Sequence, residues 1–183
     1  AEAEKIPGIE TEVGDDDIVE LGASHAQVFD TPGHTLGHII YYFADDGAAF
    51  VGDTIFAIGC GRLFEGTPEQ MWHSLQKITA LPPETKLYCA HEYTQANARF
   101  ALSVDPENAA LKERSNEVAA LRATNTPTVP TTLSQELATN PFLRASDTLM
   151  TTLFGVTMPG SVETTQTAAT TWSSIEIIGA ATA

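Results

Sequence analysis

Basic residues are scarce in this chain of 183 residues. It has 9 Lys and Arg against 24 Asp and Glu, which gives a formal net charge of −15 at pH 7. A chain with this balance should repel nucleic acids and anionic lipid surfaces, so we expect neither as a partner. If the substrate is an anion, a local basic group must carry its recognition.

Long hydrophobic runs are also absent. No stretch of about 18 apolar residues occurs, so no segment is expected to span a membrane. The first five residues, AEAEK, lack the basic region and the apolar stretch of a signal peptide. The chain does not begin with Met, which suggests a processed product or a fragment.

Cysteine is nearly absent as well. Only Cys60 and Cys89 occur, and they do not form a C-x-x-C pair. Two reduced thiols in a cytoplasmic protein are the simplest interpretation. A nucleophilic Cys89 is the alternative, because His91 lies two residues away and residues i and i+2 of a strand share a face.

The first half of the chain carries short strand patterns. Alternating, β-branched and aromatic residues predict strands within 18–29 and at 39–43, 48–51 and 86–90. Before the last strand, Thr67, Pro68 and Gln70 form a capping-box pattern, which predicts the start of a helix with one apolar face.

After Thr94 the pattern changes from strands to helices. Helices are predicted at 95–103, from a cap at Asp105-Pro106 to about Ala123, and within 135–144. We therefore predict three parts, at residues 1–94, 95–147 and 148–183, the last being a tail rich in Thr and Ala.

Two imidazoles and a carboxylate follow strand-like segments. His34 ends the string TPGH, Asp53 lies within GDT, and His91 lies within AHEY. Loops at strand ends, held by a rigid sheet, often carry functional groups. Imidazole and carboxylate together suit zinc, and also iron or manganese. The three residues are therefore candidate metal ligands, although His34 could instead bond to backbone and Asp53 could cap a turn.

Longer strings surround these candidate ligands. They are TPGHTLGH at 31–38, VGDT at 51–54, GCGRLFEGT at 59–67, CAHEYT at 89–94 and NPFLR at 140–144. Their combination resembles glyoxalase II, the hydroxyacylglutathione hydrolase family of the metallo-β-lactamase superfamily. Any one string alone would indicate only the superfamily.

The resemblance implies an α+β fold of the αββα type. Residues 1–94 would be the C-terminal portion of a metallo-β-lactamase domain, and 95–147 a small helical substrate domain. The implied activity is hydrolysis of the thioester S-D-lactoylglutathione to D-lactate and glutathione, a step of methylglyoxal detoxification. Two divalent metal ions, zinc or else iron or manganese, would share a bridging water. Metal coordination can lower the pKa of such a bound water to about 7.

The resemblance also assigns roles to single residues. Asp53 would be the catalytic bridging ligand, with His34 on one metal ion and His91 on the other. Arg62 and Tyr93 would bind the glutathione part, although a solvated loop charge and a packing role are the alternatives. The β-branched run after Pro32-Gly33 argues against a helix at 34–38, so we expect His38 to support the ligands rather than bind metal.

Two features of that family are missing from this sequence. The motif H-x-H-x-D-H, which supplies four further ligands ahead of the PGHT loop, does not occur, and no Lys or Arg follows Arg144. We therefore expect weak or absent metal binding and impaired hydrolysis in this chain. One apolar face of the sheet should also be uncovered, which favours a homo-oligomer.

Two other functions stay open at this point. One is a non-catalytic remnant or binding module that uses the helical part. The other is a mono-iron persulfide dioxygenase, which shares the Gly-Cys-Gly-Arg loop. The helical part after Thr94 and the string HEYT favour the thioesterase over the dioxygenase.

Overall fold

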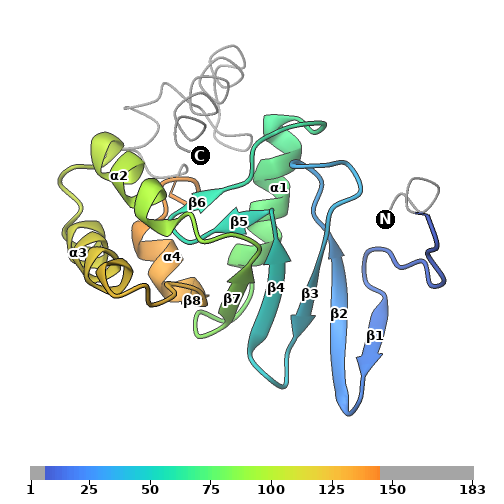
Figure 1. Ribbon diagram of the computed structural model, residues 1–183. Helices are drawn as coiled ribbons and strands as arrows, with labels where there is room; N and C mark the ends of the chain where they lie inside the picture. The colour runs from blue at the N-terminus through green and yellow to red at the C-terminus, as the bar shows by residue number, and fades with distance from the viewer. Residues whose placement is uncertain (1–6, 145–183) are drawn as a thin grey trace.

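The computed structural model describes residues 7–144, and its centre is one six-stranded sheet. The strand order is β1-β2-β3-β4-β7-β8 (Figure 1). The first four strands form an antiparallel meander, β4 and β7 are parallel, and β8 returns antiparallel to β7. The strands are β1 Ile18–Leu21, β2 Ser24–Asp30, β3 Ile39–Phe43, β4 Ala48–Gly52, β7 Lys86–Cys89 and β8 Thr131–Thr132.

Helix α1, Pro68–Thr79, covers one face of this sheet. The predicted capping box is present: the Thr67 side chain accepts from the Gln70 N–H, and the Gln70 side chain accepts from the Thr67 N–H. The apolar side of the helix packs in the main core, whose buried members include Met71, Leu75 and Ile78 from α1 and Ile40, Val51 and Leu87 from the sheet.

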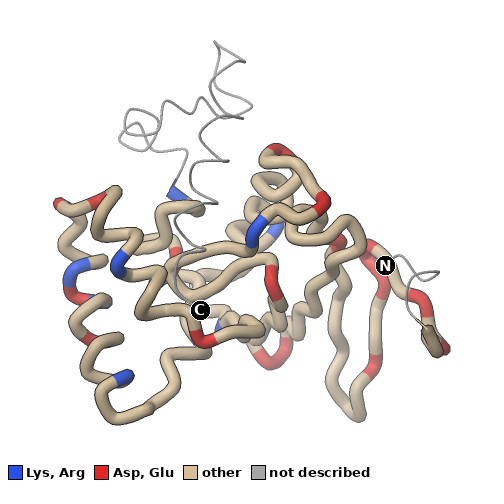
Figure 2. Tube along the Cα trace, turned by 45° about the horizontal axis from the view of Figure 1, so that its top comes forward, with Lys and Arg blue, Asp and Glu red and all other residues tan. Residues whose placement is uncertain are grey.

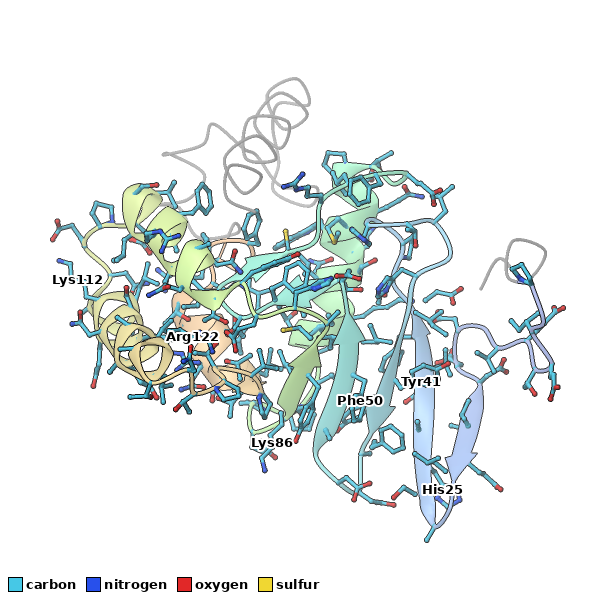
Figure 3. All side chains as sticks on the ribbon, viewed as in Figure 1. His25, Tyr41, Phe50, Lys86, Lys112 and Arg122 are labelled. Atoms are coloured by element: carbon cyan, nitrogen blue, oxygen red, sulfur yellow. The ribbon has the colours of Figure 1, made fainter. Side chains whose placement is uncertain are left out.

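The opposite face of the sheet carries a row of aromatic side chains. Ala49 and Val51 point into the core, so Phe50 between them points away from α1 and is 48% exposed (Figure 3). Its ring lies 5.7 Å from that of Phe43 and 5.0 Å from that of Tyr88, centroid to centroid. We call Tyr41, Phe43, Phe50 and Tyr88 the aromatic face.

Three helices follow the sheet: α2 Thr94–Val104, α3 Ala109–Ala123 and α4 Leu133–Thr139. The expected start of α3 at Asp105-Pro106 is wrong, since Asn108 caps it and Asp105 instead ends α2. Helix α4 begins two residues earlier than the predicted piece, because Thr132 and Gln135 form a second capping box.

The helical part is continuous with the sheet. Strand β8 comes after the predicted boundary at Thr94 and pairs with β7, and Leu133 of α4 belongs to the main core. The division at Thr94 stays a prediction, and the predicted tail at 148–183 lies outside the described residues. Within 7–144, no helix is long and apolar enough to cross a bilayer.

Candidate functional site

The three candidate ligands lie at one edge of the sheet. Strands β2, β4 and β7 run in the same direction, so the loops that follow them leave from the same edge (Figure 1). The Ala90 N–H donates to the Gly52 carbonyl at 3.0 Å, which joins the loop after β7 to the loop after β4. This arrangement brings residues 34, 53 and 91 to one place.

The Asp53 carboxylate lies between the two imidazoles. Nε2 of His91 is 3.2 Å from Oδ1 of Asp53, and Nε2 of His34 is 3.9 Å from Oδ2. The side chains are 48% exposed at His91, 26% at Asp53 and 19% at His34, so a ligand can reach all three. Their role in binding metal stays a prediction.

The three side chains are of the types that bind divalent metal ions, and one pair of donors has a suitable separation. Two donors on one tetrahedral zinc lie about 3.3–3.4 Å apart, close to the separation of His91 Nε2 and Asp53 Oδ1. The His34 pair, at 3.9 Å, is wider than that angle allows. Each carboxylate oxygen faces a different imidazole.

The number of donors is small. Among residues 7–144, no group of three or more His, Cys, Asp or Glu side chains is arranged to hold one ion. A catalytic zinc usually has three protein ligands. Each position beside Asp53 therefore offers two of them.

His38 lies directly behind Asp53. Its Nε2 accepts a hydrogen bond from the Asp53 backbone N–H at 3.0 Å, and its Nδ1 lies 3.1 Å from Thr31 Oγ1 and 3.0 Å from Thr54 Oγ1. Because Nε2 accepts, the neutral ring carries its proton on Nδ1. Burial lowers the pKa of His38, which favours this neutral form. The ring orients the Asp53 loop and its Nε2 is not available to a metal.

The loop after β6 fixes the His34 ring. Strands β5, Ile55–Phe56, and β6, Gly59–Cys60, form a small hairpin that leads into this loop. Nδ1 of His34 lies 2.9 Å from the Arg62 carbonyl, which can only accept, so Nδ1 carries a proton and the other ring nitrogen, Nε2, faces Asp53.

Glycine is required at the point where this loop crosses the Asp53 turn. A Cβ on Gly61 would lie 1.9 Å from the Asp53 carbonyl oxygen, so the backbone can approach this closely only without a side chain. The loop therefore follows the Asp53 turn closely before it reaches the Arg62 carbonyl.

The predicted substrate residues lie at the exposed border of the site, which we call the rim. The Arg62 backbone bonds the His34 ring, and the Tyr93 ring stacks on the His91 ring. Arg62 is exposed, and it is the first basic residue of the described chain. Tyr93 is 48% exposed and stacks on His91 with ring centroids 4.9 Å apart, so a core-packing role does not describe it. Sequence reasoning missed Phe64, which is 67% exposed with its ring 4.8 Å from that of His34. An apolar residue in a glycine-bounded loop was the available signal.

The structure does not favour a cysteine nucleophile. Of the described residues, Cys60 and Cys89 are not joined by a disulfide. Burial raises the pKa of the Cys89 thiol, and the thiol donates to the His91 carbonyl at 3.4 Å. A raised pKa keeps the group protonated at neutral pH, where the thiolate would be needed.

Two family models match adjacent parts of the chain. Residues 1–91 match the metallo-beta-lactamase superfamily, and residues 92–175 match the C-terminus of hydroxyacylglutathione hydrolase. The chain is 56% identical over 162 residues to a hydroxyacylglutathione hydrolase of Chelativorans sp. (strain BNC1), covering 88% of this chain and 64% of that protein. It is 61% identical over 143 residues to one of Maricaulis maris (strain MCS10), covering 78% and 56%. The chain therefore spans about three-fifths of the length of these relatives.

Two solved structures share the fold. One is the BLEG-1 B3 metallo-beta-lactamase, with a TM-score of 0.50 and 24% identity over 73% of this chain and 48% of that chain. The other is a metallo-beta-lactamase from Staphylococcus aureus subsp. aureus COL, with a TM-score of 0.52 and 20% identity over 91% and 43%. Both confirm the predicted fold class.

Proposed function

This chain belongs to the hydroxyacylglutathione hydrolase family of the metallo-β-lactamase superfamily, and from that premise we propose that it hydrolyses S-D-lactoylglutathione to D-lactate and glutathione. The observation that carries the proposal is the Asp53 carboxylate between the His34 and His91 imidazoles at the strand ends. The reaction hydrolyses the thioester: a water oxygen bonds to the carbonyl carbon and the C–S bond breaks. Of the two water protons, one ends on the glutathione sulfur and the other goes to solvent as D-lactate forms its carboxylate.

Asp53, His34 and His91 would hold divalent metal ions. Such ions, when bound, supply an acidified water and polarise the thioester carbonyl. The chain fixes its own donors for this purpose: the Arg62 carbonyl sets the His34 proton on Nδ1, and His38 holds the Asp53 backbone. Both donors are thus oriented before any ion arrives.

Arg62 and Tyr93 would bind the glutathione part of the substrate. Glutathione carries carboxylates, and the acidic residues of this chain outnumber the basic ones by 24 to 9. A cation at the rim offsets that repulsion locally, which suits the exposed Arg62. Tyr93 presents a hydroxyl beside His91.

We expect metal binding and hydrolysis by these 183 residues alone to be weak, because each ion would have two protein donors from the described residues. A thioester-hydrolysis assay with added Zn²⁺, Fe²⁺ or Mn²⁺ tests the activity, with Asp53→Ala as the matched control. Hydrolysis that needs added metal and disappears in the control supports the proposal. The absence of metal-dependent turnover in every case would favour a binding module. Stoichiometric zinc retained after chelator rinsing would contradict weak binding.

We also propose that the chain self-associates through the aromatic face. Phe50 is half exposed among stacked rings, and apolar surface of this kind favours association. The net charge of −15 opposes it, so added salt should promote it. Light scattering at low and high salt measures the mass, with Phe50→Lys as the variant expected to be monomeric. A monodisperse wild-type monomer at both salt concentrations would end this proposal.

A further inference from the structure

The turn between β5 and β6 holds a residue in an unfavourable conformation. Ile58 has φ of +60°, a left-handed value that is rare for a β-branched side chain. Such a conformation persists only where the surroundings impose it. The Ile58 side chain is fully buried in a small cluster with Ala98, Ala101 and Leu111.

Three side chains, on the helices or directly after one of them, bond the backbone of this turn. The Ile58 N–H donates to Glu136 Oε2 at 2.8 Å. Asn140 Nδ2 donates to the carbonyls of Phe56 and Gly59, at 3.3 and 2.9 Å. From α2, Asn97 Nδ2 donates to the Ala57 carbonyl at 3.0 Å. We call Glu136, Asn140 and Asn97 the clamp.

The centre of the clamp is a fully buried carboxylate. Besides the Ile58 N–H, Glu136 accepts from Asn140 Nδ2 at 2.9 Å and from Thr131 Oγ1 at 2.7 Å. Burial raises the pKa of Glu136. A buried polar network of this kind fixes one geometry when every member is satisfied. The clamp therefore sets the position of the turn relative to α4.

The turn contacts both halves of the candidate site. The Phe56 ring lies 5.9 Å from the His91 ring and 5.3 Å from the Tyr93 ring. Downstream, the chain passes through β6 to Arg62, whose carbonyl accepts from His34 Nδ1. Only two residues, Cys60 and Gly61, separate the clamped Gly59 from Arg62, so displacement of the turn should also displace that acceptor.

We propose that Glu136 and Asn140 are positioning residues. From α4, they hold the turn so that the Arg62 carbonyl fixes the His34 ring while the Phe56 ring supports His91, which keeps the two imidazoles on either side of Asp53. The consequence for hydrolysis rests on the proposed function, whereas the positioning itself does not.

The histidine rings report on the clamp directly. In ¹⁵N-labelled protein, long-range ¹H–¹⁵N correlations distinguish the protonated ring nitrogen, and His34 should show Nδ1–H in the wild type. Glu136→Leu keeps bulk but removes the acceptor, so we expect a mixed His34 tautomer and shifted His91 signals. The exposed His25, on β2, serves as an internal reference that should not change. Wild-type His34 signals in folded Glu136→Leu would overturn the proposal.

Two further variants separate positioning from general destabilisation. Glu136→Gln keeps an acceptor for the Ile58 N–H and a donor toward Thr131, so it should restore the wild-type His34 pattern. Asn108→Ala removes the α3 cap and the bond to the Ala138 carbonyl without touching the turn. It should lower Tm and leave His34 unchanged. A disturbed His34 ring in Asn108→Ala would show that any loss of helical packing has this effect, against the proposal.

If Glu136→Leu does not fold, Asn140→Ala decides. It removes the bonds to the Phe56 and Gly59 carbonyls, and we expect displacement of the His34 signals in the same direction, while unchanged signals would overturn the proposal. Titration with Co²⁺ should show affinity about tenfold weaker in the disturbed variants. Changed His34 signals without hydrolysis by the wild type would keep the positioning and end the proposed function. Hydrolysis by the wild type together with unchanged His34 signals in the variants would support the proposed function and end the positioning proposal.

Discussion

The loops at the sheet edge and the helical part hold their polar groups in opposite ways. At the edge, the His91 side chain is 48% exposed and the Asp53 side chain 26%. The Arg62 carbonyl orients the His34 ring, and the His38 ring holds the Asp53 backbone N–H. In the helical part, Glu136 is fully buried and bonded on every side. The edge therefore leaves lone pairs available to a ligand, while the helical part uses its carboxylate for positioning.

The two parts also differ in charge. Residues 7–61 contain ten Asp and Glu and no Lys or Arg, whereas eight basic residues lie between 62 and 144 (Figure 2). Several basic groups of the second part are paired within it, such as Arg114 with Glu117 at 2.7 Å and Arg144 with Asp105 at 3.6 Å. Changes at the sheet edge should therefore alter function with little loss of stability. Changes in the main core or in the Ile58 cluster should lower stability more than they alter the site.

Asp53→Ala should give the largest effect on function. The change removes the one carboxylate between the two imidazoles, and we expect metal affinity and metal-dependent hydrolysis to fall by more than about 100-fold. Stability should change little, because the side chain is partly exposed and faces the imidazoles of His34 and His91. Calorimetric titration with Zn²⁺ and thermal unfolding measure the two effects, with Asp46→Ala in the β3–β4 turn as the control. A large drop in Tm for Asp53→Ala would contradict the view that the sheet edge contributes little to stability.

Leu75→Ala should give the largest effect on stability. Leu75 is fully buried in the main core, and truncation of such a side chain costs about 2–5 kcal/mol. Leu111→Ala, in the smaller cluster beneath α3, should fall at the low end of that range, because fewer buried neighbours surround the cavity. Urea unfolding at constant pH compares them. A larger loss for Leu111 would mean that the helical part carries more of the stability than the sheet.

Arg62→Gln should have an intermediate effect on function alone. Loss of a rim cation weakens binding of an anionic substrate, so we expect KM to rise about tenfold with kcat nearly unchanged. The Arg62 carbonyl still holds His34, since it belongs to the backbone. Arg99→Gln on α2, also exposed, is the matched control. A fall in kcat without a change in KM would assign Arg62 to the reaction rather than to binding.

The smallest expected effect is at the ion pair of Asp15 and Lys77. The hydrogen bond from Lys77, at 2.9 Å to both carboxylate oxygens, lowers the pKa of Asp15. A lowered folded-state pKa adds stability above the unfolded value and loses it as pH falls through the folded value. Asp15→Asn should thus cost less than about 1 kcal/mol at pH 7 and nothing well below pH 3. Unfolding curves at both pH values check this, and a pH-independent cost would contradict it.

Local signals were readable in the sequence, whereas long-range ones were not. Thr67 and Gln70 predicted the start of α1 because a capping box is contained within four residues. The sequence placed His34, Asp53 and His91 after strand-like segments, and the shared direction of β2, β4 and β7, which the structure shows, brings them to one edge. The second capping box, at Thr132, was missed inside a stretch of Thr and Pro.

The clamp could not be predicted from the sequence. Glu136 stands in a short helix among polar residues, where a carboxylate usually faces solvent. Its partner Ile58 lies 78 residues earlier, and Asn140 reaches Phe56 across 84 residues. No local pattern links such positions, so only the folded structure shows that they meet. The same holds for Phe64, whose contact with His34 depends on how the glycine-rich loop folds back.

The position of β8 limits how the polypeptide can acquire its shape during synthesis. β7 pairs with β4 on one side and with β8, Thr131–Thr132, on the other. Helices α2 and α3 lie between β7 and β8 in the sequence. On the ribosome, β7 therefore remains an unprotected edge until both of those helices have emerged. A gene cut at the start of α2 would leave that edge permanently bare, so the two halves should not be expressed as separate products.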